Sequence, residues 1–209
     1  KVMVVGIQPH ELVIQCMGIT SNFDQVTESQ WLGIKNRVKE SGIFRDVTAV
    51  VDVSGSMNGV PMQVAIALGL LISDCTEGPY HGSVITFHEI PQWHRITGTT
   101  LLNKVKCLSK APWGGSTNMQ AVFDLILNTA TRNKLSNDDL PTMVLIISDM
   151  EFDTCCSNRT NFEEIKAEFE NSGYKLPSLI FWNVSGREGN IPVNKNDKNV
   201  ALVSGSSPS

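Results

Sequence analysis

The chain has 209 residues and no apolar run long enough to cross a membrane. Its longest apolar stretch, around residues 65–72, falls well short of the ~18 residues that a membrane span needs. No signal peptide is visible at its start. We therefore expect no membrane partner and an intracellular protein, with the cytoplasm as the favoured compartment.

Cysteine and clustered positive charge are also scarce. The five cysteines show no repeated Cys-x-x-Cys spacing, which argues against a zinc site and a disulfide scaffold and favours a reducing compartment. The formal net charge is −4, and the basic cluster at Lys35, Arg37 and Lys39 is flanked by Glu28 and Glu40. We interpret that cluster as a solvated helix face. RNA is therefore not the favoured partner, because phosphate binding needs clustered cations.

Several catalytic motifs are missing as well. The sequence contains no P-loop, no Gly-x-Gly-x-x-Gly fingerprint and no Gly-x-Ser-x-Gly nucleophile elbow. Aspartyl-phosphate hydrolases need a second aspartate two residues after the first, and Ser54 occupies that position after Asp52. A serine nucleophile needs a nearby base, and no histidine is expected beside Ser54 or Ser56. We therefore expect a protein that is not an enzyme.

The pattern that is present indicates an α/β fold. Hydrophobic residues make up 41% of the chain and charged residues 18%, which is typical of a globular domain. Apolar, β-branched segments alternate with helical patterns, which predicts a doubly wound, mainly parallel central sheet flanked by helices on both faces. The expected strands are 47–53, 83–88, 93–96, 142–149, 177–184 and 200–205. Helices are expected after Pro9, at 28–40, 61–75, 100–110 and 118–135, and after a capping box at 160–163.

Three separate segments carry oxygen-bearing side chains near predicted strand ends or helix starts. The segment "AVVDVSGSMNGVPM", residues 49–62, places an aspartate after a buried strand and two serines at every second position after it. A threonine lies in "WGGSTNMQ", and a second aspartate ends "LIISD". Because ligands of parallel sheets sit beyond the carboxyl ends of the strands, we expect these side chains to converge. They are Asp52, Ser54, Ser56, Thr117 and Asp149.

All five side chains offer hard oxygen atoms, and no His or Cys joins them. Such a donor set suits Mg²⁺, and Mn²⁺ and Ca²⁺ are compatible with it. The two carboxylates balance the charge of a dication, so the occupied site would carry little net charge. We therefore expect a vacant coordination position that an acidic group of a partner can fill.

These segments resemble the von Willebrand factor A domain over roughly residues 45–207. The motif of that family, called the metal-ion-dependent adhesion site, is Asp-x-Ser-x-Ser, then Thr, then Asp. The five side chains above match its five positions. The resemblance implies a central sheet, flanking helices, and a divalent ion whose free position takes an acidic residue of a partner protein. Residues 1–43 then form a helical N-terminal segment before a domain at 44–209.

A closer resemblance is to a group of such domains in plants and some viruses that carries only a domain-of-unknown-function label. It rests on "DVSGSM", "ITFH", "WGGSTNMQAVFD", "SDMEFD", "FWNV" and "ALVSG". The Ro-type RNA-binding proteins are a more distant resemblance. Many A domains have Gly after the last motif aspartate, whereas this chain has Met150, Glu151 and, further on, Asp153. The two extra carboxylates could raise the cation affinity, enlarge the site or only cap the next turn. We also expect the usual closing C-terminal helix to be absent.

Other interpretations of these residues stay open. An Asp-x-Ser sequence after a strand is often a simple capping turn, and "LVSGSS" near the C-terminus has Leu202 where the aspartate would stand. The domain could belong to a ribonucleoprotein, with the basic N-terminal helix touching RNA, or could be a structural subunit of an assembly. It could also be a Mg²⁺-dependent phosphoester hydrolase. The sequence does not predict an oligomeric state.

Overall fold

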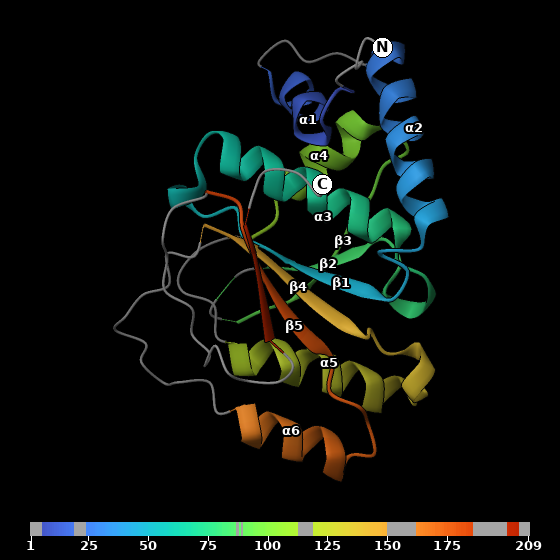
Figure 1. The fold of residues 1–209 in the computed structure, drawn as a ribbon, viewed down its shortest axis with the longest axis vertical. Helices are drawn as coiled ribbons and strands as arrows, with labels where there is room; N and C mark the ends of the chain where they lie inside the picture. The colour runs from blue at the N-terminus through green and yellow to red at the C-terminus, as the bar shows by residue number, and fades with distance from the viewer. Residues whose placement is uncertain are drawn as a thin grey trace, which may run out of the picture.

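The centre of the molecule is a six-stranded sheet with the order β3-β2-β1-β4-β5-β6 (Figure 1). The computed structural model describes residues 6–18, 24–86, 88, 90–112, 119–149, 162–185 and 200–204. Neighbouring strands are parallel, except that β2 and β3 are antiparallel. The strands are β1 (Val47–Val51), β2 (Ser83–Thr86), β3 (Trp93–Arg95), β4 (Met143–Ser148), β5 (Ser178–Asn183) and β6 (Val200–Ser204). The predicted doubly wound, mainly parallel sheet is confirmed.

Helices cover both faces of this sheet. Four lie on one side, and α5 and α6 lie on the other (Figure 1). The first group comprises α1 (Pro9–Met17), α2 (Gln25–Ser41), α3 (Val60–Cys75) and α4 (Leu101–Ser109), and the second comprises α5 (Met119–Asn133) and α6 (Phe162–Asn171). No helix in the described part of the chain is both long and apolar enough to cross a membrane.

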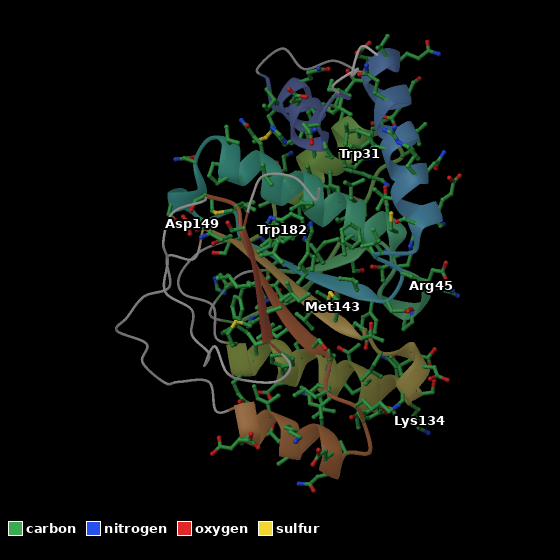
Figure 2. All side chains as sticks on the ribbon, viewed as in Figure 1. Trp31, Arg45, Lys134, Met143, Asp149 and Trp182 are labelled. Carbon is green, nitrogen blue, oxygen red and sulfur yellow. The ribbon has the colours of Figure 1, made fainter. Side chains whose placement is uncertain are left out.

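Two hydrophobic clusters hold these layers together. Alternate residues of a strand point to opposite faces, so Ala49 and Val51 pack with α1–α4 while Val50 packs with α5 and α6. Every residue of β1 is buried, as expected for a parallel strand covered on both faces. Trp31 of α2 and Trp182 of β5 belong to the first cluster and are labelled in Figure 2.

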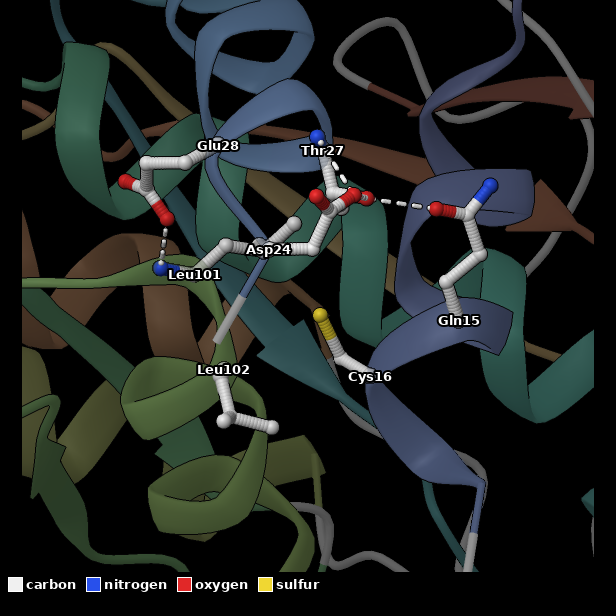
Figure 3. Close-up of a pocket in the computed structure, with 7 residues that line it drawn as sticks. All are labelled: Gln15, Cys16, Asp24, Thr27, Glu28, Leu101 and Leu102. Carbon is white, nitrogen blue, oxygen red and sulfur yellow. Dashed lines mark hydrogen bonds between the residues drawn. The ribbon is translucent and has the colours of Figure 1, made fainter. Parts of the chain in front are cut away.

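Polar contacts around a cavity of about 220 Å³ tie α2 to α4 and α1 to α2 (Figure 3). The Glu28 carboxylate accepts a hydrogen bond from the Leu101 backbone N–H at 2.7 Å, at the start of α4. The Thr27 hydroxyl donates to Gln15 of α1 at 2.6 Å. Residues of α1 and α2 share one hydrophobic cluster with α3 and the sheet. The proposed division at residue 43 stays a prediction.

Element boundaries differ modestly from those expected from the sequence. Helix α2 begins at Gln25 rather than at residue 28, because the Asp24 side chain caps it by accepting the N–H groups of Val26 and Thr27. Strand β1 ends at Val51 rather than at residue 53. The predicted capping box at residues 160–163 lies partly outside the described residues.

Candidate functional site

The candidate site lies where the chain reverses its direction of winding through the sheet. The chain runs from β1 outward to β2 and β3, and then returns to β4 on the other side of β1. In open α/β sheets the crevice beyond the carboxyl ends of such neighbouring strands is the usual ligand-binding position. Asp52 follows β1 and Asp149 follows β4, so both predicted aspartates stand at this crevice.

Asp52 is held firmly at the end of β1. Its side chain is buried, with the residue only 2% exposed, and its backbone N–H donates to the Ile147 carbonyl at 3.0 Å. The Oδ1 atom accepts the Ser54 backbone N–H at 2.8 Å, and Oδ2 accepts the Ser148 hydroxyl at 2.8 Å. The carboxylate therefore bridges the turn after β1 and the neighbouring strand β4.

The two motif serines lie on a 3₁₀ turn directly after Asp52. Ser54 stands at the N-cap position of the turn Gly55–Met57, where its backbone carbonyl accepts the Met57 N–H at 3.1 Å, and the buried Met57 anchors the turn in the core. The Ser54 and Ser56 hydroxyl oxygens are 3.1 Å apart. Adjacent ligands of an octahedral Mg²⁺, each about 2.1 Å from the ion, stand about 3.0 Å from one another. The spacing of the two hydroxyls is therefore compatible with neighbouring positions on one ion.

A row of polar residues at the strand ends extends this edge. Ser148 stands at the position next to Asp52 because Val51 pairs with Ile147, and Asn183 is the register partner of Ser148. The Ser185 hydroxyl donates to the Asn183 side chain at 3.0 Å and to the Asp149 carbonyl at 3.4 Å. Sequence analysis missed Ser148, Asn183 and Ser185. The polar residues Ser148 and Asn183 at the ends of the apolar strands β4 and β5 are visible in the sequence, but their pairing depends on the strand register.

Burial shapes the electrostatics of this edge. It is the main cause that raises the pKa of Asp52 above its usual range, and the nearby Asp149 carboxylate raises it further. Hydrogen bonds from Ser54 and Ser148 act in the opposite direction. Asp149 itself is 5% exposed and is labelled in Figure 2. Two acidic side chains thus share a poorly solvated position, where a bound cation would offset the cost of their charges.

The predicted site residues are only partly visible. The structure brings together Asp52, Ser54, Ser56 and Asp149, whereas Thr117, Glu151 and Asp153 lie outside the described residues and stay predictions. Among the described residues, no three His, Cys, Asp or Glu side chains are grouped so that they could hold a metal ion. The described part of the candidate set has two carboxylates and two hydroxyls, and the fifth predicted donor, Thr117, lies outside the described residues.

The sheet order, the helical layers and the position of the site define a doubly wound α/β protein of Rossmann-like architecture. Within that class, residues 46–209 match the family described as Domain of unknown function (DUF7788). The chain belongs to this family.

Three similar proteins place the chain in a wider context. It is 52% identical, over 98% of its length, to Uncharacterized protein L728 of Acanthamoeba polyphaga mimivirus, and it spans 36% of that protein. It is 29% identical over 51% of its length to Inter-alpha-trypsin inhibitor heavy chain H2 of Mus musculus, and it spans 12% of that protein. The crystal structure of the Deinococcus radiodurans RO (RSR) protein superposes on 94% of the chain with a TM-score of 0.56 and 16% identity, and the chain covers 41% of it. That similarity shows a shared fold.

Proposed function

We propose that this chain is a metal-dependent protein-interaction module of the von Willebrand factor A type. In this proposal Asp52, Ser54 and Ser56 hold a divalent cation, Mg²⁺ or alternatively Mn²⁺ or Ca²⁺. Thr117 and Asp149 complete the set, directly or through water. The partner is a protein that supplies an Asp or Glu side chain to the ion.

The observation that carries the proposal is the geometry around Asp52. A buried carboxylate, fixed by the Ser54 N–H and the Ser148 hydroxyl, faces the β1/β4 crevice together with a second acidic residue. Two hydroxyl oxygens stand 3.1 Å apart on the adjoining turn. A capping turn alone requires the bond to the Ser54 N–H, but it does not require a second buried aspartate at the same crevice.

The charge balance favours an acidic partner. Two carboxylates neutralise a dication, so a further anionic ligand binds without excessive repulsion from the protein. A bound Mg²⁺ would supply a Lewis-acidic position open to an incoming oxygen atom. The chain's own residues orient that position, because Ser148 and Ser54 fix the rotamer of Asp52 and Ser185 contacts the segment of Asp149.

The proposal is tested by affinity capture with the purified chain in Mg²⁺ and in EDTA. We expect captured proteins that are retained in Mg²⁺, lost in EDTA and lost with Asp52→Asn. The matched control is Glu40→Gln, which removes an exposed carboxylate at the C-terminal end of α2 and should capture the same proteins as the wild type.

Circular dichroism of both variants verifies that they are folded. Capture that is equal in EDTA and Mg²⁺, or that is unchanged in Asp52→Asn, would refute a metal-dependent interaction.

A further inference from the structure

A cysteine and a histidine lie side by side where α4 packs on the edge strand β3. The Sγ atom of Cys107, on α4, is 3.6 Å from the Nε2 atom of His94, on β3. Both residues are partly exposed. Arg95 pairs with Ser83, the first residue of β2, so the pair stands near the amino ends of the strands, whereas Asp52 follows the carboxyl end of β1. The pair is therefore separate from the candidate metal site.

The fold holds this pair in place from two directions. Neighbouring residues of a strand point to opposite faces, and Trp93 packs with the α5 and α6 cluster, so His94 points toward α4. The loop after β3 also lies against α4, because a Cβ atom at Gly98 would stand 2.6 Å from a Cβ atom of that helix. Gly98 has a φ of +112°, a conformation that favours glycine. The close approach of this loop brings Thr97 to Cys107.

Two further donors are directed at the sulfur atom. The Thr97 backbone N–H donates to Sγ of Cys107 at 3.4 Å, and the Thr97 hydroxyl donates to it at 3.5 Å. Hydrogen bonds to a charged group favour the charged form of that group. The adjacent His94 imidazole can accept the thiol proton, as the base beside a nucleophile does. The cluster therefore combines a thiol, a base, and donors for the charge that deprotonation creates.

Two other cysteines in the described part of the chain have a different environment. Cys16 and Cys75 are buried, and burial is the main cause that raises the pKa of each thiol, that of Cys75 to about 11. The thiolate is the reactive form of cysteine, so a thiol with a raised pKa is a poor nucleophile at neutral pH. Cys107 is instead partly exposed and stands beside a base, so these three thiols should differ in reactivity.

We infer that Cys107 is a reactive thiol that hydroperoxides oxidise to a sulfenic acid. His94 takes the thiol proton, and the sulfur attacks the terminal oxygen of the hydroperoxide. A sulfur–oxygen bond forms as the oxygen–oxygen bond breaks, and the proton on His94 passes to the departing oxygen. The sulfur is oxidised by two electrons, and the hydroperoxide is reduced to an alcohol, or to water when the reagent is hydrogen peroxide. The Thr97 N–H and hydroxyl stabilise the sulfur anion before the attack.

The test is oxidation of the purified full chain by hydrogen peroxide at pH 7. Dimedone traps sulfenic acids covalently, and peptide-resolved mass spectrometry follows each cysteine separately. We expect dimedone on Cys107 and none on Cys16 or Cys75. The urea-unfolded chain is the reference for an unassisted thiol. Cys107 should be oxidised about ten-fold faster in the folded protein than in urea, because only folding brings the base and the donors to its sulfur.

His94→Gln removes the base and keeps a polar side chain of similar size. It should slow the oxidation of Cys107 about ten-fold or more in the folded protein and leave the rate in urea unchanged. Thr97→Val removes the hydroxyl and should slow the oxidation less, because the backbone N–H stays. The matched control is His81→Gln, at an exposed histidine whose Nδ1 atom lies 2.7 Å from the Thr76 carbonyl, and it should react as the wild type does.

Circular dichroism verifies that the variants are folded. The inference is overturned if dimedone does not label Cys107, if Cys107 reacts no faster in the folded protein than in urea, or if His94→Gln leaves the folded rate unchanged. The first two outcomes need only the wild type, so they decide the question even if a variant does not fold.

Discussion

At the scale of single residues, the Asp52 carboxylate combines strong burial with a fixed orientation. Its two oxygens are held by different elements, the turn after β1 and the end of β4. Hydrogen bonds from Ser54 and Ser148 only partly offset the cost of burying its charge, because its pKa stays raised. A buried carboxylate with a raised pKa adds little to the stability of the folded protein by itself. A bound cation would stabilise its charged form.

This state predicts a specific pH dependence in the presence of EDTA. The folded protein retains the Asp52 proton to a higher pH than the unfolded chain does, so the free energy of unfolding should fall as pH rises from about 4 through the raised pKa. Asp52→Asn should remove that decline and be more stable than the wild type at pH 7 in EDTA. Urea unfolding followed by circular dichroism measures both.

Adding Mg²⁺ should make the wild type more stable than Asp52→Asn, the reverse of the order expected in EDTA. At a concentration one hundred times its Kd, an ion that binds only the folded state adds about 2.7 kcal/mol to the wild type. Asp52→Asn should gain almost nothing. A wild type that is equally stable in EDTA and in Mg²⁺ would contradict the role given to Asp52.

The sequence identifies some site residues and misses others for a clear physical reason. Asp52, Ser54 and Ser56 are recognisable because their spacing is local, and Asp149 because it ends an apolar strand. Ser148 and Asn183 act through the register between strands, which pairs them across β4 and β5. A single sequence without strand register does not specify that pairing.

At the scale of elements, the close approach of α3 to β1 brings Asp52 and the turn after it into position. Gly69 of α3 makes this approach possible, because a Cβ atom there would lie 2.7 Å from Cγ2 of Val51. Val51 is β-branched and fully buried, so its side chain has little freedom to move aside. The helix and the strand therefore pack at a distance that only glycine permits.

Two glycine substitutions test this packing. Gly69→Ala should lower the free energy of unfolding by about 1–3 kcal/mol, because it overpacks the core. Gly33→Ala is the matched control in the exposed part of α2, where a Cβ atom meets nothing within 4 Å, and it should stabilise the protein by about 0.5–1 kcal/mol. Urea denaturation measures both. If Gly69→Ala is as stable as the wild type, the packing of α3 on β1 is wrong.

Most elements are predictable from periodicity, and their ends are not. The apolar runs at β1, β4 and β5 and the helical stripe of α5 are long and regular, so the sequence specifies their type. The start of α2 depends on the side chain of Asp24, which a search for apolar periodicity passes over. The packing of α1 against α3 and α4 depends on tertiary contacts that no local pattern encodes.

At the scale of the whole molecule, the two ends of the sheet have different chemistry. The carboxyl ends of β1 and β4 carry Asp52 and Asp149, the candidate cation site. The amino ends border a pocket lined by Arg45, Glu77 and the aspartates 46, 138 and 139. The chain spans about a third of the mimivirus relative and 41% of the Deinococcus protein.

The most direct test of the central claim is anomalous diffraction from crystals of the chain grown with MnCl₂. The account predicts one manganese peak per chain at the carboxyl ends of β1 and β4, within about 2–2.5 Å of the Ser54 and Ser56 hydroxyl oxygens. It predicts no such peak in crystals of Asp52→Asn. An absent peak in the wild type, or a peak that persists unchanged in the variant, would contradict it.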